Sequence, residues 1–293
     1  MSRTRGTFFL IWISVLFVAL FLPARAPACA FPGCPLGRFI PAAAHARGAG
    51  GTLWITDLRL LNTGSEELPI TLRFLPPNRD NGGDEGITVT VPPRESVLLP
   101  DVVARTFGAE GGGAIWMTTP FGSGHFLAEA RTYDASHPEL GRRGFSSQAV
   151  AGASASSDSF LFVSNEPGPL GSRTNVGVVN PLSVPVLVDL TLLDATGREL
   201  GTSAVGLGAF GYAQVNDVFV ALGSGGSAVV NGIVRIHART WVVDVPTLSV
   251  PVFGYATVIE NRSNDPSFSL AEPDPPDVPP PPRAPLIPGR SDR

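Results

Sequence analysis

One sequence unit occurs twice in this chain, and that duplication limits its possible folds more than any single residue does. Residues 56–62 read TDLRLLN and residues 174–180 read TNVGVVN, and the likeness continues on both sides of the two strings. The spacing of 118 residues (174 − 56) is well above the roughly 20 to 50 residues of a solenoid repeat. Each copy is therefore predicted to be a whole domain of a tandem array.

Apolar residues recur at every second position in both copies. The alternating residues of the first copy align with those of the second: Ile70, Leu72 and Phe74 with Val188, Leu190 and Leu192. Such alternation is typical of a strand with one face on a core and the other in water, as in antiparallel sheets. The chain also has 33 Gly and 29 Pro, which separate short apolar runs. The sequence therefore predicts an all-β fold, with an antiparallel β-sandwich in each copy.

Each copy is also expected to contain one short helix. Asp101 and Asp217 each precede a short apolar segment that ends in a glycine, Gly108 or Gly223. Aspartate is suited to cap a helix N-terminus, and glycine to end a helix in the left-handed conformation. Capping accounts for both aspartates without a catalytic role.

The first hairpin carries a family resemblance. Residues 60–72, LLNTGSEELPITL, resemble the strand, Asn-x-Gly turn and strand of bacterial Ig-like sandwich modules such as the CARDB family. The second copy keeps the asparagine as Asn180 but continues with Pro181 and Leu182. The whole layout also resembles uncharacterised secreted bacterial proteins built from two such repeats. The resemblance implies two tandem Ig-like domains that serve as a stalk, adhesion or accessory module, with no catalytic residues.

Both copies of the hairpin keep one asparagine, which is Asn62 in the first copy and Asn180 in the second. An asparagine side chain can satisfy backbone groups at the end of a strand. Both asparagines are therefore expected to be structural, and neither needs a ligand to explain it.

The N-terminus has the three parts of a secretory signal. Two arginines precede the apolar run 8–22, and a proline and small residues follow it. Small-x-small triplets end at Ala26 and at Ala30, so cleavage after either residue stays open. The sequence predicts export, to the surface, the periplasm or the medium, with no membrane span after signal removal; an uncleaved N-terminal anchor is the alternative.

The predicted domain plan follows from these features. Its parts are a signal (1–26), a leader (27–37), repeat 1 (38–150), a linker (151–158), repeat 2 (159–271) and a disordered proline-rich tail (272–293). The two cysteines, Cys29 and Cys34, lie outside the repeats, and whether they pair depends on the cleavage point.

The charge composition argues against a nucleic-acid partner. The net charge is −4, and all 21 basic residues are scattered arginines, whereas phosphate backbones are bound by clustered Lys and Arg. No cofactor is expected, since the four histidines show no metal spacing.

Residues 78–86 are the most site-like segment. They offer the carboxylates of Asp80, Asp84 and Glu85 to a hard cation such as calcium, although without the alternating spacing of an EF-hand loop. A plain acidic loop is the alternative to this metal site.

Two tryptophans are candidates for binding a glycan. Trp116 and Trp241 each lie in an apolar strand pattern, so a role in the core is the alternative for both. Like the acidic loop, the segment around Trp241 differs between the copies. A specific function is therefore expected where the two copies differ.

Together these features predict a non-enzymatic exported structural or interaction module at or outside the bacterial cell surface. A glycan- or protein-binding adhesin-like module is the alternative, and a hydrolase is a remote one. A hydrolase would require carboxylates such as Glu129 and Asp134 to converge. An odd and an even position of one regular strand point to opposite faces, which argues against this.

Overall fold

A computed structural model describes residues 37–120, 125–141, 143–241 and 248–274. The predicted signal, the leader up to residue 36, both cysteines and the tail beyond residue 274 lie outside the described residues. The chain divides into residues 1–30 and one compact unit, residues 31–293, to which every described residue belongs. Strands make up 58% of the described residues, so the all-β prediction is confirmed.

Among the described residues, no helix is both long enough and apolar enough to cross a membrane.

Apart from 3-10 turns, the described residues of the two copies contain the same strands and one α-helix each, in the same order. The first copy contains β1 (Arg38–Arg47), β2 (Leu53–Asn62), β3 (Leu68–Leu75), β4 (Ile87–Val91), β5 (Ser96–Leu99), α1 (Val102–Arg105), β6 (Gly111–Thr118), β7 (Phe126–Asp134), β8 (Gly144–Gln148) and β9 (Val150–Ala151). The second contains β10 (Asp158–Asn165), β11 (Ser172–Val179), β12 (Val186–Leu193), β13 (Glu199–Leu207), β14 (Tyr212–Val215), α2 (Val218–Ala221), β15 (Val229–Thr240), β16 (Phe253–Glu260), β17 (Pro266–Leu270) and β18 (Glu272–Pro273). Three single-turn 3-10 helices lie between strands, at Ala49–Gly51, Pro138–Leu140 and Gly152–Ser154.

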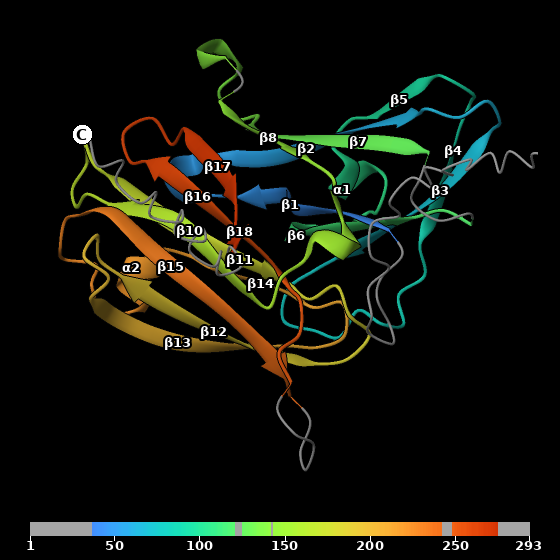
Figure 1. Ribbon diagram of the computed structural model, residues 1–293. Coiled ribbons are helices and arrows are strands. Elements are labelled where there is room, and N and C mark those ends of the chain that lie inside the picture. The colour runs from blue at the N-terminus through green and yellow to red at the C-terminus, as the bar shows by residue number, and fades with distance from the viewer. Residues whose placement is uncertain (1–36, 121–124, 142, 242–247, 275–293) are drawn as a thin grey trace, which may run out of the picture. The chain divides into compact units, whose positions relative to one another are not determined.

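Strand pairing repeats as well (Figure 1). The second copy forms the sheets β13-β12-β15-β10-β18 and β14-β11-β16-β17, and the first copy has the equivalent neighbours β4-β3-β6-β1-β9 and β5-β2-β7-β8. In the first copy these two sets join into one nine-stranded sheet, because the end of β1 pairs with the start of β2. The described strands thus form three antiparallel sheets.

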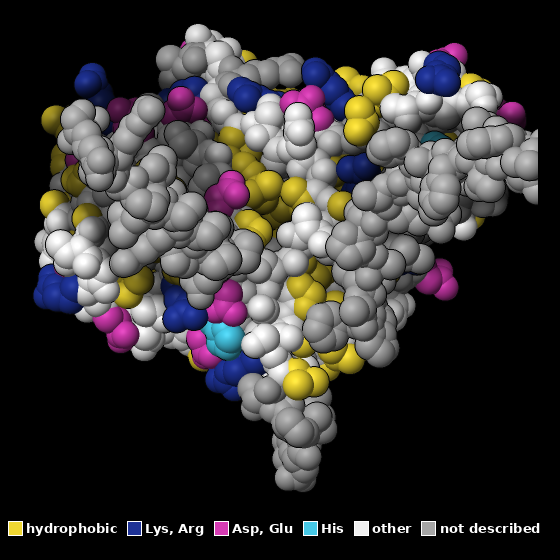
Figure 2. Space-filling view, viewed as in Figure 1, with side chains coloured by type: hydrophobic (Ala, Val, Ile, Leu, Met, Phe, Trp, Pro, Cys, Tyr) yellow, Lys and Arg dark blue, Asp and Glu magenta, His cyan; other side chains and the backbone are white. Residues whose placement is uncertain are grey.

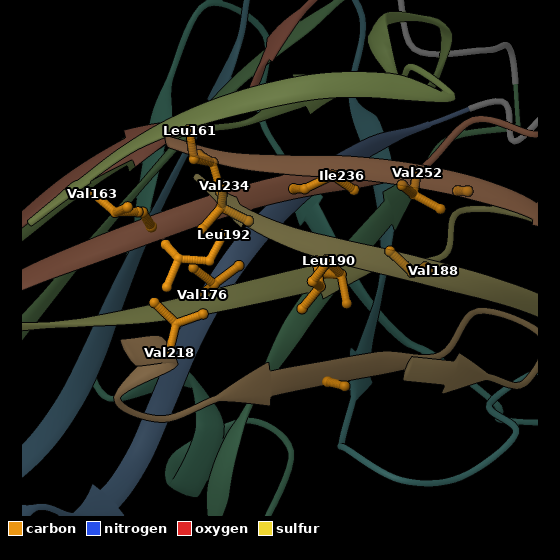
Figure 3. Close-up of a cluster of buried hydrophobic side chains, with 14 of the residues drawn as sticks. Leu161, Val163, Val176, Val188, Leu190, Leu192, Val218, Val234, Ile236 and Val252 are labelled. Carbon is orange, nitrogen blue, oxygen red and sulfur yellow. The ribbon is translucent and has the colours of Figure 1, made fainter. Parts of the chain in front are cut away.

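Each copy has its own apolar core between its two sets of strands. In the second copy the alternating residues of β12 are fully buried. They lie beside Val234 of the neighbouring strand β15 and face Val176 of β11, which belongs to the other sheet (Figure 3). In the first copy Ile70, Leu72 and Ile115 occupy the equivalent core. Burying a side chain of this size stabilises a fold by roughly 1.5–3 kcal/mol, so the alternation seen in the sequence accounts for both cores.

The turn asparagines are equivalent in structure and fully buried. Asn180 donates from Nδ2 to the carbonyl oxygens of Val184 and Gly208, both at 2.7 Å, and its Oδ1 accepts from the Leu182 amide at 3.0 Å. Asn62 makes the same three bonds in the first copy, to Glu66 O (2.7 Å), to Val91 O (3.0 Å) and from the Gly64 amide (2.8 Å). Each side chain thus replaces water for three backbone groups at a strand end.

The two helix-capping predictions have different outcomes. Asp217 accepts a hydrogen bond from the Val220 amide at 3.2 Å, as a capping side chain does. Asp101 makes no such bond, so the predicted side-chain cap is wrong there. Its carboxylate is instead held by Nδ1 of His45 at 2.9 Å, which ties α1 to β1. Both closing glycines have the left-handed φ, +63° at Gly108 and +82° at Gly223.

A third buried cluster contains residues of both copies. It joins Phe39 and Ala114, from the outward face of the first copy, to Val179, Tyr212 and Tyr255, from the outward face of the second. Residues 151–158, predicted to be a plain linker, contain the end of β9, a 3-10 turn and the start of β10. The predicted boundaries between tandem domains stay a prediction, because the described residues of both copies share this apolar cluster.

Candidate functional site

Trp116 lies in the contact between the copies. Its ring stacks on Phe210 of the second copy, with centroids 4.3 Å apart, and lies 6.0 Å from the Phe39 ring. The Arg73 guanidinium carbon lies 4.8 Å from its centroid. The structure therefore places this predicted glycan-binding residue in a packed aromatic contact, where the ring is not presented to a ligand.

On the other side of the contact, a tyrosine lies over a glycine. Gly177 and Tyr255 are cross-strand neighbours, and a Cβ added at Gly177 would come within 2.1 Å of the Tyr255 ring. The ring can lie flat on the sheet only because position 177 has no side chain. The buried hydroxyls of Tyr255 and Tyr212 are 2.7 Å apart, and Tyr255 donates to Oε1 of Gln214 at 2.7 Å.

Both tyrosines are expected to resist ionisation. Burial raises the pKa of Tyr212 from 10.0 to about 12, although the hydrogen bond with Tyr255 opposes this. Burial also raises the pKa of Tyr255 well above 10.0, and Tyr212 adds to the rise. Because the folded pKa lies above the unfolded one, the stability from these hydroxyls is present below pH 10 and lost as the pH rises from 10 towards 12.

An alkaline titration checks this expectation. Tyrosinate absorbance from Tyr212 and Tyr255 should appear only together with loss of the β circular-dichroism signal. Tyr133 supplies the chain's third tyrosine signal and is removed by a Tyr133→Phe background. If the two remaining tyrosines ionise near pH 10 while the sheet signal persists, the buried pair does not exist in solution.

Residues 78–86, in the loop between β3 and β4, form hydrogen bonds with the second copy. Asn81 is buried; its Nδ2 donates to Phe210 O and its amide donates to Ala209 O, both at 2.9 Å. Arg79 donates from Nε to Oδ1 of Asn81 at 2.7 Å and pairs with Asp84. This loop, which differs between the copies, therefore ties the first copy to the turn before β14.

The three predicted metal ligands have separate positions in that loop. Asp84 is paired with Arg79, Asp80 accepts from the Gly82 amide at 2.7 Å, and Glu85 is exposed. Within the described ranges, no group of three or more His, Cys, Asp or Glu side chains is placed to hold a metal ion. The local hydrogen bonds use the carboxylates of Asp80 and Asp84 to shape the loop.

Trp241, the other predicted glycan-binding residue, is 56% exposed. Its ring lies against Gly206, where an added Cβ would come within 2.5 Å, and Asp80 lies against Gly208, where an added Cβ would meet its Cα at 2.9 Å. Gly206, Gly208 and Asp80 line a hollow of about 350 Å³, so Trp241 and the acidic loop each contact a glycine of the same hollow.

A larger cleft of about 630 Å³ opens between the copies. This volume is within the range of small-molecule sites, about 300–1,000 Å³. Its lining includes charged, amide, hydroxyl and aromatic side chains: Arg47, Trp54, Phe145, Arg173, Asn175, Asn216, Asp217 and Thr257. Apolar side chains gather near the centre of the face shown in Figure 2, with acidic and arginine side chains around them.

The polar side chains of the cleft have fixed orientations. Arg173 donates to the side-chain oxygens of Asn261 and Asn264, at 2.7 and 3.1 Å. Asn175 accepts from the Asp217 amide at 3.0 Å through Oδ1. That bond fixes the orientation of the Asn175 amide group, and its Nδ2 donates to no group within the described residues.

The carboxylates of the remote hydrolase alternative do not converge. Along β7 the buried residues alternate with more exposed ones, which puts Glu129 and Asp134 on opposite faces. Asp134 is buried and accepts from the amides of Ser136 (2.9 Å) and Leu53 (3.1 Å). Burial raises the pKa of Asp134, but the hydrogen bonds from Ser136 and Leu53 outweigh it and leave the pKa below 3.8. A carboxyl group held ionised in this way is a poor proton donor.

Sequence reasoning missed the cleft residues and the tyrosine pair. The signal was present in the alignment of the copies: Gly177 and Tyr255 stand where the first copy has Arg59 and Glu129, which are also cross-strand neighbours. An exchange of a charged pair for a glycine and an aromatic residue marks an outward face that is covered.

Comparisons with known proteins do not identify a family. No protein-family model matches the chain, and no curated protein matches it. Among solved structures, two of a glycosyl hydrolase family 2 member from Bacteroides cellulosilyticus are similar over 74% and 78% of this chain, at 8% and 9% identity and a TM-score of 0.16 for both. The chain covers 26% and 25% of their length, and a likeness this low carries no argument about fold or function.

Proposed function

We propose that this protein is a non-enzymatic, exported interaction module in which two copies of one β unit act as a single body. The observation that supports this most is the apolar contact built from the outward faces of both copies, around Trp116, Phe210 and Tyr255. An interface of this kind fixes the two copies against each other. The cleft beside it is then a preformed surface for a partner.

The finer description as two tandem Ig-like sandwiches is part of this proposal. The equivalent strand neighbours of the two copies support it, as do their separate cores. The resemblance of residues 60–72 to CARDB-like modules also supports it.

A glycan- or protein-binding, adhesin-like role is the second candidate. The exposed ring of Trp241 favours it, because an aromatic ring resting on Gly206 leaves its other side to solvent.

The proposal is tested in the host bacterium with an epitope-tagged full-length chain. We expect the protein in the envelope or the medium, with its N-terminus at residue 27 or 31 by mass spectrometry, and chemical cross-linking to one recurrent surface component. Retention in the cytoplasm with residues 1–26 intact would refute export. Cross-linking that is the same for the wild type and an interface variant, Phe210→Ala, would refute the role of the joined copies.

A further inference from the structure

We propose that the cleft between the copies binds a carboxylated sugar of the uronic acid type. This rests on the proposed function, since it names the ligand of that interaction module. The juxtaposition that carries it is two arginines, outward-facing amide donors and aromatic rings around one cavity of about 630 Å³.

The charge of the cleft differs from that of the chain. The chain has a net charge of −4, yet the cleft is lined by Arg47 and Arg173 against a single carboxylate, Asp217. Both hydrogen bonds of the Arg173 guanidinium go to neutral amide oxygens, and within the described residues neither arginine is paired with a carboxylate. Arginine binds carboxylates through two parallel hydrogen bonds. The cleft therefore favours an anionic ligand group.

Hydrogen bonds inside the protein also orient the amides of the cleft as donors. The oxygen of Asn175 is occupied by the Asp217 amide at 3.0 Å. The oxygen of Asn216 accepts from Nε2 of Gln214 at 2.6 Å, and Gln214 is itself held by the Tyr255 hydroxyl at 2.7 Å. Both asparagines line the cleft, and their NH₂ groups donate to no group within the described residues, so they are available to a ligand. A site rich in donors suits a ligand rich in oxygen acceptors, such as the hydroxyls and carboxylate of an acidic sugar.

Acceptors and apolar surface complete the site. The Thr257 hydroxyl can accept or donate, and Asp217 uses Oδ1 for the Val220 amide, which leaves Oδ2 to accept from a ligand hydroxyl. Trp54 and Phe145 supply aromatic rings to the wall, and Phe145 is held in place by stacking on Phe268 at 4.9 Å. Rings of this kind pack against the apolar C–H face of a pyranose, whereas an inorganic anion would gain nothing from them.

Binding is tested by calorimetric titration of the purified full chain with D-glucuronate, D-galacturonate and short oligomers of each. D-Glucose, D-galactose and their oligomers serve as neutral counterparts. We expect at least one uronate ligand to bind about 10-fold more tightly than its neutral counterpart, and Arg173→Gln to lower its affinity by about 10-fold. Arg47→Gln should weaken binding as well, and it covers the case in which Arg173→Gln fails to fold, because Arg47 is exposed.

Arg198→Gln is the matched control. Arg198 is an exposed arginine on the β12–β13 hairpin, paired with Asp194 and outside the cleft, so its loss should leave the affinity unchanged. No binding of any uronate ligand, equal binding of the neutral sugars, or affinity unchanged in both cleft variants would each overturn the proposal. Loss of binding in Trp241→Ala with normal binding in the cleft variants would place the site at Trp241 instead. An exported protein that cross-links a surface partner but binds no uronate would refute only the sugar.

Discussion

Replacing Asn180 by aspartate is expected to lower the free energy of unfolding by about 3–5 kcal/mol, because it leaves an uncompensated buried charge. The Asn180 side chain is fully buried, and its Nδ2 donates to two carbonyl oxygens at 2.7 Å. Aspartate has the same shape, but it places a carboxylate against both carbonyls and supplies no donor. Asn62→Asp should have a similar effect in the first copy, since Asn62 makes the equivalent bonds.

Urea unfolding of Asn180→Asp, Asn62→Asp and the wild type measures this loss. The penalty should shrink at acid pH, since a protonated carboxyl recovers one donor and its folded pKa lies above the unfolded value. Asn231→Asp is the control: Asn231 is an exposed asparagine with φ +57°, where aspartate is tolerated, so the change should stay within about 0.5 kcal/mol. Equal losses in all three variants would mean that charge alone, and not the buried bonds, sets the effect.

Truncation of the two tryptophans is expected to have unequal effects. Trp116→Ala should lower the free energy of unfolding by about 3–5 kcal/mol, as a packed large-to-small change does, because it removes the stacking on Phe210 and Phe39. Trp241→Ala should cost less than about 1 kcal/mol, because its ring is 56% exposed. Denaturant unfolding followed by circular dichroism compares the two variants directly.

Trp116→Phe refines this second test. Within the described residues, the buried Trp116 Nε1 has no hydrogen-bond partner, so phenylalanine removes an unpaired donor while it keeps a ring against Phe210. Its loss should be well below that of Trp116→Ala. If Trp241→Ala proves the more destabilising variant, Trp116 does not hold the copies together.

The outer faces of the two copies explain why they meet on one side only. Trp116 stands where the second copy has Arg235, since each lies opposite a phenylalanine of the neighbouring strand, Phe39 or Phe160. Arg235 forms an ion pair with Asp158 at 2.9 Å on the open face of the second copy. Burial raises the pKa of Asp158, but hydrogen bonds from His237 and Arg235 outweigh it and keep the pKa below 3.8, so this face stays charged. Charged outer faces discourage further stacking of copies.

Local patterns in the chain determined much of this protein. The every-other-residue alternation was enough to predict the strands and their buried faces, because the period of a strand is two and does not depend on distant residues. The duplicated asparagine predicted part of its backbone role for the same reason: two of its three partners, Leu182 and Val184, lie two and four residues ahead, whereas the third, Gly208, follows strand β13.

The tertiary structure alone decided which outward faces meet and where the cleft opens. Tyr255 is buried only because Gly177 and the first copy lie against it, and Asn81 became a link between the copies because Phe210, 129 residues away, offers it a carbonyl. The sequence around Asp101 also could not predict its partner: its carboxylate bonds to His45 of β1 and not to the amides of α1. Contacts between distant residues depend on the packing of whole sheets, so no local pattern contains them. The duplication therefore determined the scaffold, and the packing of unlike outer faces determined the site.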